Sequence, residues 1–366
     1  MTVIGLHSFN SQILNELYSS QNYTGNMAFS GIGLYLLLSA INFGLSGRSF
    51  SQLSNILGQN YHELFDTANW RNSERAYECL DRRYLAEEIS SMNSVVFFSG
   101  DIFDYYKQIS GLVCSLNHIK INDSDPEESA CRLNKWISQT TFGSIWNMFD
   151  HSMMSENIMI FIHTLFFRAD WKTKFNPALT KHELFYDDKC RPLKVAMMNQ
   201  RSFYPIYDSI KDNFQILFKP LAHPYFLAAI VLPRVGHTIK DVLKSFKFNE
   251  MKNYFQNSSL KYADFKLPKF QVLSHADLVQ PLTLFGITDI FERNHSGFGK
   301  MTYRNIAKIA VDELGLREIE FSRAIPEESI SQQYLFHVRR PFLFFVYSSI
   351  DNHVFFSAIV TNPNEA

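Results

Sequence analysis

The chain has 366 residues, of which 46% are hydrophobic, and its 34 Phe and 17 Tyr supply enough apolar material for a large core. Lys and Arg (35) nearly balance Asp and Glu (36), so bulk charge gives no attraction to nucleic acid or to an anionic membrane. This length allows one large domain or two average ones. We therefore expect a globular protein whose partner is another protein or a small molecule.

Cysteine spacing and the start of the chain restrict the compartment. The four cysteines, Cys79, Cys114, Cys131 and Cys190, form no CxxC pair, so we expect buried free thiols rather than a disulfide framework or a metal site. The first ten residues lack the basic region and apolar run of a secretory signal, and no stretch approaches the ~20 apolar residues of a membrane span. We expect a cytoplasmic protein, extracellular only through unconventional release or if the natural start lies elsewhere.

Hydrophobic spacing predicts helices in the first part of the chain. Residues 6–19 carry apolar side chains at helical intervals, and residues 26–44 indicate a buried strand, a turn and a helix capped by Ser30. Further elements are expected in order: a charged surface helix over 71–90, a buried strand over 95–98, a helix over 102–117, and a helix that begins after the turn at 123–128.

Strands dominate the second part of the chain. Residues 158–167 form a continuous apolar run of strand length. Later strands are predicted at 214–219, 226–232, 264–272, 306–312, 341–349 and 353–360. No linker of Pro, Gly and Ser divides the chain, and no internal repeat is present. Helices first and strands later are typical of a single α+β domain.

One polar segment lies between two of these strands. Residues 309–330 begin as an apolar strand, become acidic around Gly315, and stay polar until shortly before the apolar block at 341–347. A polar segment tethered between core strands is where a binding or bait loop is expected.

Motifs for enzyme chemistry are absent from the sequence. It contains no GxSxG elbow, HExxH pair, Walker loop or GxGxxG after a strand. The 12 histidines are scattered, and His163, inside a predicted strand, is expected to have a structural, hydrogen-bonded role. The two Arg-Arg pairs are too small for a nucleic-acid footprint. We therefore expect neither an enzyme nor a bound metal or cofactor.

The motifs that are present resemble those of the serpins, the serine-protease-inhibitor family, along nearly the whole chain and in the family's order. They lie at residues 26–30, 134–145, 165–171, 195–198, 263–270, 284–291, 340–342 and 362–363. The chain is similar to members that lack a signal peptide. The resemblance implies a monomer with one domain over 1–366. Its helices would surround a large central mixed sheet, with smaller sheets beside it, and Trp171 would pack at the top of the central sheet. It also implies an exposed reactive-centre loop at about 313–337.

Several positions depart from the family pattern. Gly31 stands where a proline is usual, and Ser144 and Ala358 replace the usual lysine and glycine. The family commonly pairs an asparagine and a histidine in the middle of the central sheet, and here the corresponding residues are reversed, His163 and Asn305. Both side chain types donate and accept, so we predict that His163 and Asn305 keep this hydrogen bond.

For the loop, the resemblance implies a bait for a target serine or cysteine protease. In inhibitory serpins the protease cuts the loop, which then inserts as a strand into the central sheet and carries the acyl-linked protease with it. Counting along the chain places the bond at Ser329-Ile330, or one residue later when counted back from residues 340–342. The hinge of the loop would begin at Glu313 and Gly315.

The hinge composition supports an alternative function. An inserted strand buries alternate side chains, and here one face would take Leu316, Glu318 and Glu320, the other Arg317 and Ile319. Burying an unpaired carboxylate costs several kcal/mol, so insertion should be slow. The protein is then either a protease inhibitor or a non-inhibitory serpin that acts as protease substrate, carrier, chaperone or regulatory binder. An enzyme or receptor that uses this fold otherwise is a remote third alternative.

Overall fold

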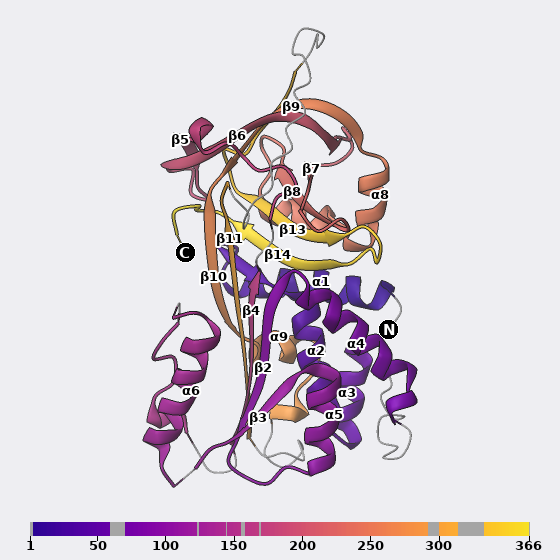
Figure 1. Cartoon of the computed structure of the whole chain (residues 1–366), viewed down its shortest axis with the longest axis vertical. Coiled ribbons are helices and arrows are strands. Elements are labelled where there is room, and N and C mark those ends of the chain that lie inside the picture. Colours follow the sequence, from indigo (N-terminus) through magenta and orange to yellow (C-terminus); the bar gives the residue numbers. More distant parts are fainter. Residues whose placement is uncertain are drawn as a thin grey trace. The chain divides into compact units, whose positions relative to one another are not determined.

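A computed structural model of the chain describes residues 3–58, 70–122, 124–143, 145–154, 158–167, 170–291, 300–313 and 333–365 (Figure 1). The chain forms two compact units, one of residues 1–9, 30–166 and 275–307, the other of residues 10–29, 167–274 and 308–366. Each unit is assembled from segments far apart in the sequence. Neither is therefore a contiguous domain that a linker could separate.

The predicted early helices are present. Their bounds are α1 (Val3–Ser20), α2 (Gly31–Asn42), α3 (Gly47–Leu57), α4 (Glu74–Glu87), α5 (Asp104–Cys114) and α6 (Pro126–Thr140). Ser30 caps α2 as predicted, because its side chain accepts from Gly33 N at 3.2 Å. Short helices follow later in the chain: α7 (Ile239–Ser245), α8 (Met251–Gln256) and α9 (Val279–Leu284). Single 3₁₀ turns lie at Trp70–Asn72, His151–Met153, Pro177–Leu179, Phe248–Glu250 and Asp289–Phe291.

Helix α5 ends earlier than the sequence indicated. The prediction of a helix through residue 117 is wrong, because Ser115 adopts a left-handed conformation with φ 54° and ends the helix. Residues Leu116–Lys120 then form strand β3, which pairs in parallel with β2 (Ser90–Phe98). Pairing with β2 supplies hydrogen bonds that hydrophobic spacing along a single segment cannot reveal.

A five-stranded sheet has the strand order β10-β11-β4-β2-β3, with β4 (Ile158–Phe167), β10 (Phe270–Asp277) and β11 (Lys300–Val311). In the first unit, Figure 1 shows α2, α3, α4 and α5 on one side of β2 and β3, and α6 on the other. Leu133 and Ile137 of α6 pack with Ile160 and Ile162 of β4. His163, the next residue in β4, points to the other face of the sheet, away from α6, and there it faces Gly33 of α2.

A nine-stranded sheet belongs to the second unit, with the order β1-β14-β13-β8-β7-β6-β9-β12 and β5 paired to β6. Its strands are β1 (Met27–Phe29), β5 (Lys181–Tyr186), β6 (Pro192–Tyr207), β7 (Phe214–Pro220), β8 (Phe226–Pro233), β9 (Ser259–Pro268), β12 (Tyr334–His337), β13 (Phe342–Ser348) and β14 (Val354–Val360). Strand β6 pairs with β9 along most of its length and with β7 only at Ile206 and Tyr207. Strand β6 therefore connects β7 on one side with β9 on the other. The smaller sheets that we expected beside the central sheet are in this way joined into one sheet.

The strand predicted at 264–272 is two strands. Lys269 separates β9 from β10, and its backbone N–H donates to Ala196 O at 2.8 Å. Pro268 and Lys269 interrupt the apolar residues here, and a proline inside a strand pattern was a signal of the break that the prediction did not use.

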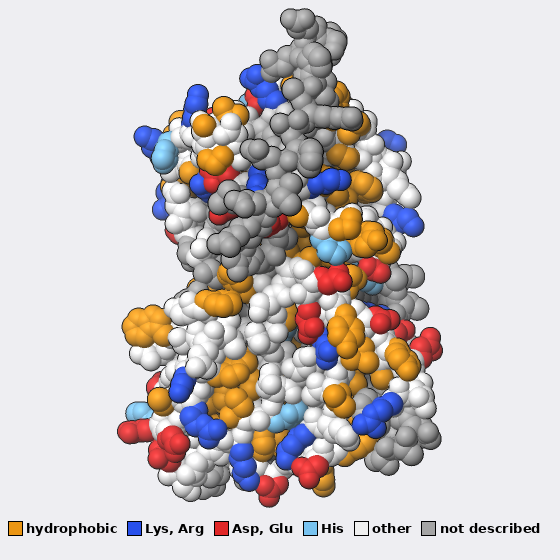
Figure 2. Space-filling model, in the orientation of Figure 1, with side chains coloured by type: hydrophobic (Ala, Val, Ile, Leu, Met, Phe, Trp, Pro, Cys, Tyr) orange, Lys and Arg blue, Asp and Glu red, His pale blue; other side chains and the backbone are white. Residues whose placement is uncertain are grey.

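Cysteine burial and surface charge complete the description. Cys79 and Cys114 are buried free thiols as predicted, but the prediction is wrong for Cys131 and Cys190, which are exposed. Cys131 lies on the solvent side of α6, and Cys190 occupies the turn between β5 and β6, where no core covers it. Within the described ranges, none of the helices combines the length and the hydrophobicity needed to cross a bilayer. Acidic and basic side chains are interspersed on the face in Figure 2, as the net charge of −1 suggests.

Candidate functional site

The segment that the sequence indicated as a loop lies largely outside the described residues. Residues 314–332 are not described, and with them the predicted bond Ser329-Ile330 and the hinge residues Gly315, Leu316, Arg317, Glu318, Ile319 and Glu320. The described chain shows what holds this segment at its two ends. Both ends, Asp312–Glu313 after β11 and Tyr334 in β12, belong to the second compact unit.

Glu313 forms the centre of the first attachment, which we call the sheet-side anchor (Asp312 and Glu313 with Trp171, Phe175, Thr180 and Lys269). Its side chain is buried, accepts from Thr180 Oγ1 at 2.7 Å, and lies 2.5 Å from Lys269 Nζ. Its carbonyl accepts from Phe175 N at 3.2 Å. Burial acts to raise the pKa of Glu313, but the hydrogen bonds from Lys269 and Thr180 outweigh it and lower the pKa. The carboxylate is therefore charged and fixed where the undescribed segment begins.

Trp171 holds the residue before Glu313. The indole is buried, and its Nε1–H donates to Asp312 O at 2.9 Å. The ring packs edge-on against Phe175 and Phe344, with centroids 5.8 and 6.4 Å away. Two consecutive backbone carbonyls at the end of β11 are thus fastened by one short segment, residues 171–175.

Lys219 in β7 contacts residues 171–175, and the sequence analysis did not identify this residue. Its side chain is only 1% exposed. Nζ donates to Thr173 O at 2.8 Å and to Gln200 Oε1, and it lies 5.1 and 4.6 Å from the ring centres of Trp171 and Phe175. Burial lowers the pKa of Lys219 to about 7. A lysine inside the apolar run 214–221 was the available signal, because buried strands rarely carry an unpaired charge.

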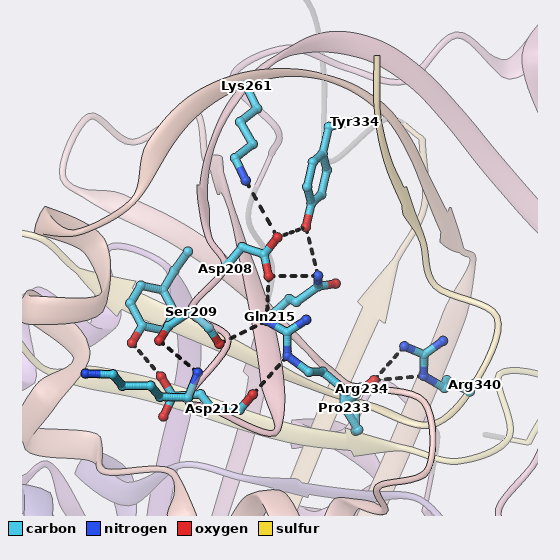
Figure 3. Close-up of polar contacts among 11 residues, drawn as sticks. Asp208, Ser209, Asp212, Gln215, Pro233, Arg234, Lys261, Tyr334 and Arg340 are labelled. Atoms are coloured by element: carbon cyan, nitrogen blue, oxygen red, sulfur yellow. Dashed lines mark hydrogen bonds and ion pairs between the residues drawn. The ribbon is translucent and has the colours of Figure 1, made fainter. Parts of the chain in front are cut away.

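The second attachment, the edge-strand anchor, holds Tyr334 at the start of β12. This strand has four residues and pairs in parallel with β9, between Tyr334–His337 and Ala263–Lys266. Side chains reinforce the short strand (Figure 3): Tyr334 Oη donates to Asp208 Oδ2 at 2.7 Å, and Lys261 Nζ lies 4.3 Å from the centre of the Tyr334 ring. An edge strand this short has few backbone bonds, so these contacts decide how firmly it is held.

Asp208 is the hub of the edge-strand anchor. Its carboxylate also accepts from Arg234 Nη2 at 2.6 Å and Gln215 Nε2 at 3.0 Å, and Lys261 Nζ lies 3.6 Å away (Figure 3). Burial acts to raise the pKa of Asp208, but the hydrogen bonds from Tyr334, Gln215 and Arg234 lower it to about 2. Asp208 sits in a turn after β6, where an acidic residue is ordinary, so the sequence gave no reason to select it.

Aromatic side chains connect the neighbourhoods of the two anchors. Phe265 of β9 packs against Phe175 at 5.7 Å and against Phe336 of β12 at 6.0 Å, measured between ring centroids. The described residues on either side of 314–332 therefore belong to one continuous packed region.

Comparison with known proteins matches this architecture. The family model described as "Serpin (serine protease inhibitor)" matches residues 5–363. The chain belongs to the serpin family. Among its relatives is glia-derived nexin of Rattus norvegicus, 23% identical over 370 residues that cover 96% of this chain and 91% of the relative. The serpin fold shown by the structure, helices with a mixed central sheet, agrees with the α+β fold that the sequence predicted.

Two solved structures illustrate the range of this fold. Native protease nexin-1 with heparin has a TM-score of 0.82 and 21% identity, and the match covers 99% of this serpin and all (100%) of that chain. Human thyroxine-binding globulin has a TM-score of 0.80 and 18% identity, covering 98% of each chain. At these identities the likeness establishes the fold alone.

The middle of the five-stranded sheet of this serpin holds His163. The imidazole is buried, and its Nδ1 lies 2.9 Å from Ser94 Oγ of β2. Nε2 has no hydrogen-bond partner within the described part of the chain. The side chain of Asn305 in β11 lies outside the described residues, so its contact with His163 stays a prediction. Burial lowers the pKa of His163 to about 4, so the ring is neutral at neutral pH.

Disrupting the hub of the edge-strand anchor should destabilise the protein measurably. Asp208→Asn removes the charge that Arg234 and Lys261 face and should cost about 1–3 kcal/mol of unfolding free energy. The matched control is Asp101→Asn, which removes an ion pair between Asp101 and Lys120. The Asp101 side chain is 97% exposed, so this variant should change the unfolding free energy by less than about 0.5 kcal/mol. Urea unfolding of both variants measures the difference. Equal midpoints would show that Asp208 adds no more than a surface pair.

Proposed function

We propose that this serpin inhibits a serine-type or cysteine endopeptidase by presenting residues 314–332 as a bait loop, with the reactive bond at Ser329-Ile330 or one residue later. The observation that carries the proposal is the pair of anchors: Glu313 is held by Thr180 and Lys269, and Tyr334 by Asp208. A segment whose two flanks are held by part-buried polar contacts would keep both sides of a cut bond attached to the scaffold.

The comparisons support a protease as the partner. The matching family model is described as a serine protease inhibitor, and a further relative, from Xenopus tropicalis, is named leukocyte elastase inhibitor. A neutral residue at the bond, Ser329 or Ile330, suits an elastase-like enzyme better than one that requires a basic or large aromatic residue there. The proposal therefore favours elastase-like serine proteases.

A second candidate function is that of a non-inhibitory serpin, which is cleaved without trapping or binds another ligand. The hinge residues Leu316, Glu318 and Glu320 favour it, because an inserted strand would bury two carboxylates on one face. Thyroxine-binding globulin shares the fold, and its name states a ligand rather than a protease. The fold by itself is thus compatible with both functions.

Incubation with a panel of serine and cysteine proteases separates the two. We expect a covalent complex with an elastase-like enzyme that survives denaturing electrophoresis, with cleavage at residues 329–331. The control replaces both Ser329 and Ile330 with proline, which blocks either alternative bond and should abolish the complex. Cleavage at this bond without any complex would establish the second candidate, and no cleavage between residues 314 and 332 by any enzyme would overturn the proposal.

A further inference from the structure

Lys219 is a buried cation without an anionic partner. Its Nζ contacts two oxygens, the carbonyl of Thr173 and Oε1 of Gln200, and the faces of three rings, Trp171, Phe175 and Tyr204. None of the described carboxylates lies within an ion-pair distance of it. A buried charge of this kind costs free energy, so a lysine here is not explained by stability, since an apolar side chain of similar length would fill the space more favourably. A residue that lowers the stability of the fold commonly has a functional role.

The contacts of Lys219 all lead to residues 171–175. Besides the bond to Thr173 O, its partner Gln200 donates through Nε2 to Lys174 O at 2.7 Å. The ammonium lies over the rings of Trp171 and Phe175, which are the same two residues that bind the carbonyls of Asp312 and Glu313. One face of residues 171–175 is therefore held by Lys219 and Gln200, and the other face holds the end of β11.

We propose that Lys219 is a positioning residue for the loop: its charged ammonium fixes residues 171–175 and, through Trp171 and Phe175, the sheet-side anchor. Loss of the proton weakens the hydrogen bond to Thr173 O and removes the attraction to the aromatic rings. The sheet-side anchor then loosens. This inference rests on the proposed function only in taking residues 314–332 as the functional loop, because the contacts themselves do not depend on a protease.

The pH range follows from the surroundings of Nζ. Burial lowers the pKa of Lys219 from the ordinary 10.5 to about 7, so the anchor should loosen as pH rises through neutrality. The titratable group facing it from β6 is Tyr204, whose phenol donates to Gln200 Oε1 at 2.6 Å and whose pKa is raised far above its ordinary value by burial. Residues 171–175 face it with two rings and a carbonyl, and β7 carries it. Lys219 is thus the group that changes charge here near pH 7.

Global stability should respond in the opposite direction. Between pH 7 and 10.5 the unfolded chain holds a proton on Lys219 that the folded protein has released, so this group makes folding more favourable as pH rises through that range. Below pH 7 both states are protonated and the full cost of burying the charge is present. A change that neutralises Lys219 should therefore raise the unfolding midpoint while it loosens the sheet-side anchor.

The test is Lys219→Met in the full chain, with Lys240→Met, an exposed lysine of the same unit, as control. Hydrogen exchange measured by mass spectrometry should show at least tenfold faster exchange in peptides covering residues 170–176 and 308–313, together with a higher urea midpoint. In a variant in which Trp70, Trp136 and Trp146 are replaced by Phe and Lys219 is kept, the fluorescence of Trp171 should change with a midpoint near pH 7. Adding Lys219→Met to this variant should abolish the transition.

Two results would overturn the inference. One is a raised midpoint with unchanged exchange at residues 170–176, which would make Lys219 a purely structural residue. The other is a fluorescence transition that persists in Lys219→Met. Neither measurement depends on inhibition of a protease, so failure of the proposed inhibition would leave these results interpretable, and failure here would leave the proposed inhibition standing.

Discussion

Replacing Gly33 with alanine is expected to cost at least about 2 kcal/mol of unfolding free energy, even though alanine is normally the better helix former by about 1 kcal/mol. A Cβ at Gly33 would lie 2.2 Å from Nε2 and 2.8 Å from Cε1 of His163. Both residues are buried, so neither α2 nor the imidazole can move aside without disturbing packed neighbours.

The matched control is Gly111→Ala in α5. There a Cβ would meet Leu116 O at 3.6 Å and His118 Cε1 at 3.9 Å, which are ordinary contact distances. This variant should therefore gain about 0.5–1 kcal/mol from helix propensity. Urea unfolding should place the two glycine variants on opposite sides of the wild type.

A double-mutant cycle identifies the cause of the effect. His163→Asn shortens the side chain opposite Gly33, so the combined Gly33→Ala, His163→Asn variant should be more stable than the sum of the single effects by about 2 kcal/mol. Additive single effects would show that the clash with His163 is not what excludes a side chain at residue 33. The presence of His163, where the family commonly has asparagine, would then account neither for the glycine at residue 33 nor for the loss of stability in Gly33→Ala.

Changing the hinge should increase trapping by about tenfold or more. We expect the triple variant Leu316→Thr, Glu318→Ala, Glu320→Ala to form more covalent complex per cleaved molecule than the wild type. Each unpaired carboxylate that enters a sheet costs several kcal/mol, and about 1.4 kcal/mol corresponds to a tenfold change in the partition between insertion and hydrolysis. The ratio of complex to cleaved serpin, read from denaturing gels at several enzyme concentrations, measures this partition.

The control removes the same number of carboxylates elsewhere. Glu127→Ala with Glu128→Ala alters two exposed side chains at the start of α6 and should leave the ratio unchanged. If the triple variant traps no better than the wild type, the hinge carboxylates do not limit insertion. If the wild-type protein already converts every cleavage into a covalent complex with the protease, the second candidate function is excluded.

Much of the fold could be predicted because local signals agreed with the tertiary structure. Ser30 followed by an apolar run indicated α2, and the uninterrupted apolar residues 158–167 indicated β4. The elements that were missed or misplaced depend on distant partners. Strand β3 exists because it pairs with β2, and the break between β9 and β10 at Lys269 depends on Ala196 of β6.

The candidate site divides in the same way. Trp171 and Glu313 lie in or beside family motifs, so the sequence could name them, although it could not show that Trp171 binds Asp312 O or that Lys269 and Thr180 hold Glu313. Asp208, Arg234 and Lys219 carry no local signal of a shared role. They come together because the strands of one sheet bring turns and side chains from separate parts of the chain to the ends of the loop.

The sequence by itself determined the family and the α+β class, because these depend on the order of motifs and on periodicities within single segments; the loop at about 313–337 stays a prediction. The composition of the hinge, with Leu316, Glu318 and Glu320, was also readable directly, and it raised the question of whether the loop inserts. Only the tertiary structure decided how the chain is held on either side of residues 314–332: by the buried carboxylate of Glu313 with Thr180 and Lys269, and by the contact of Tyr334 with the Asp208 hub. Burial and the distances between side chains set these energies, and both arise only when distant segments pack together.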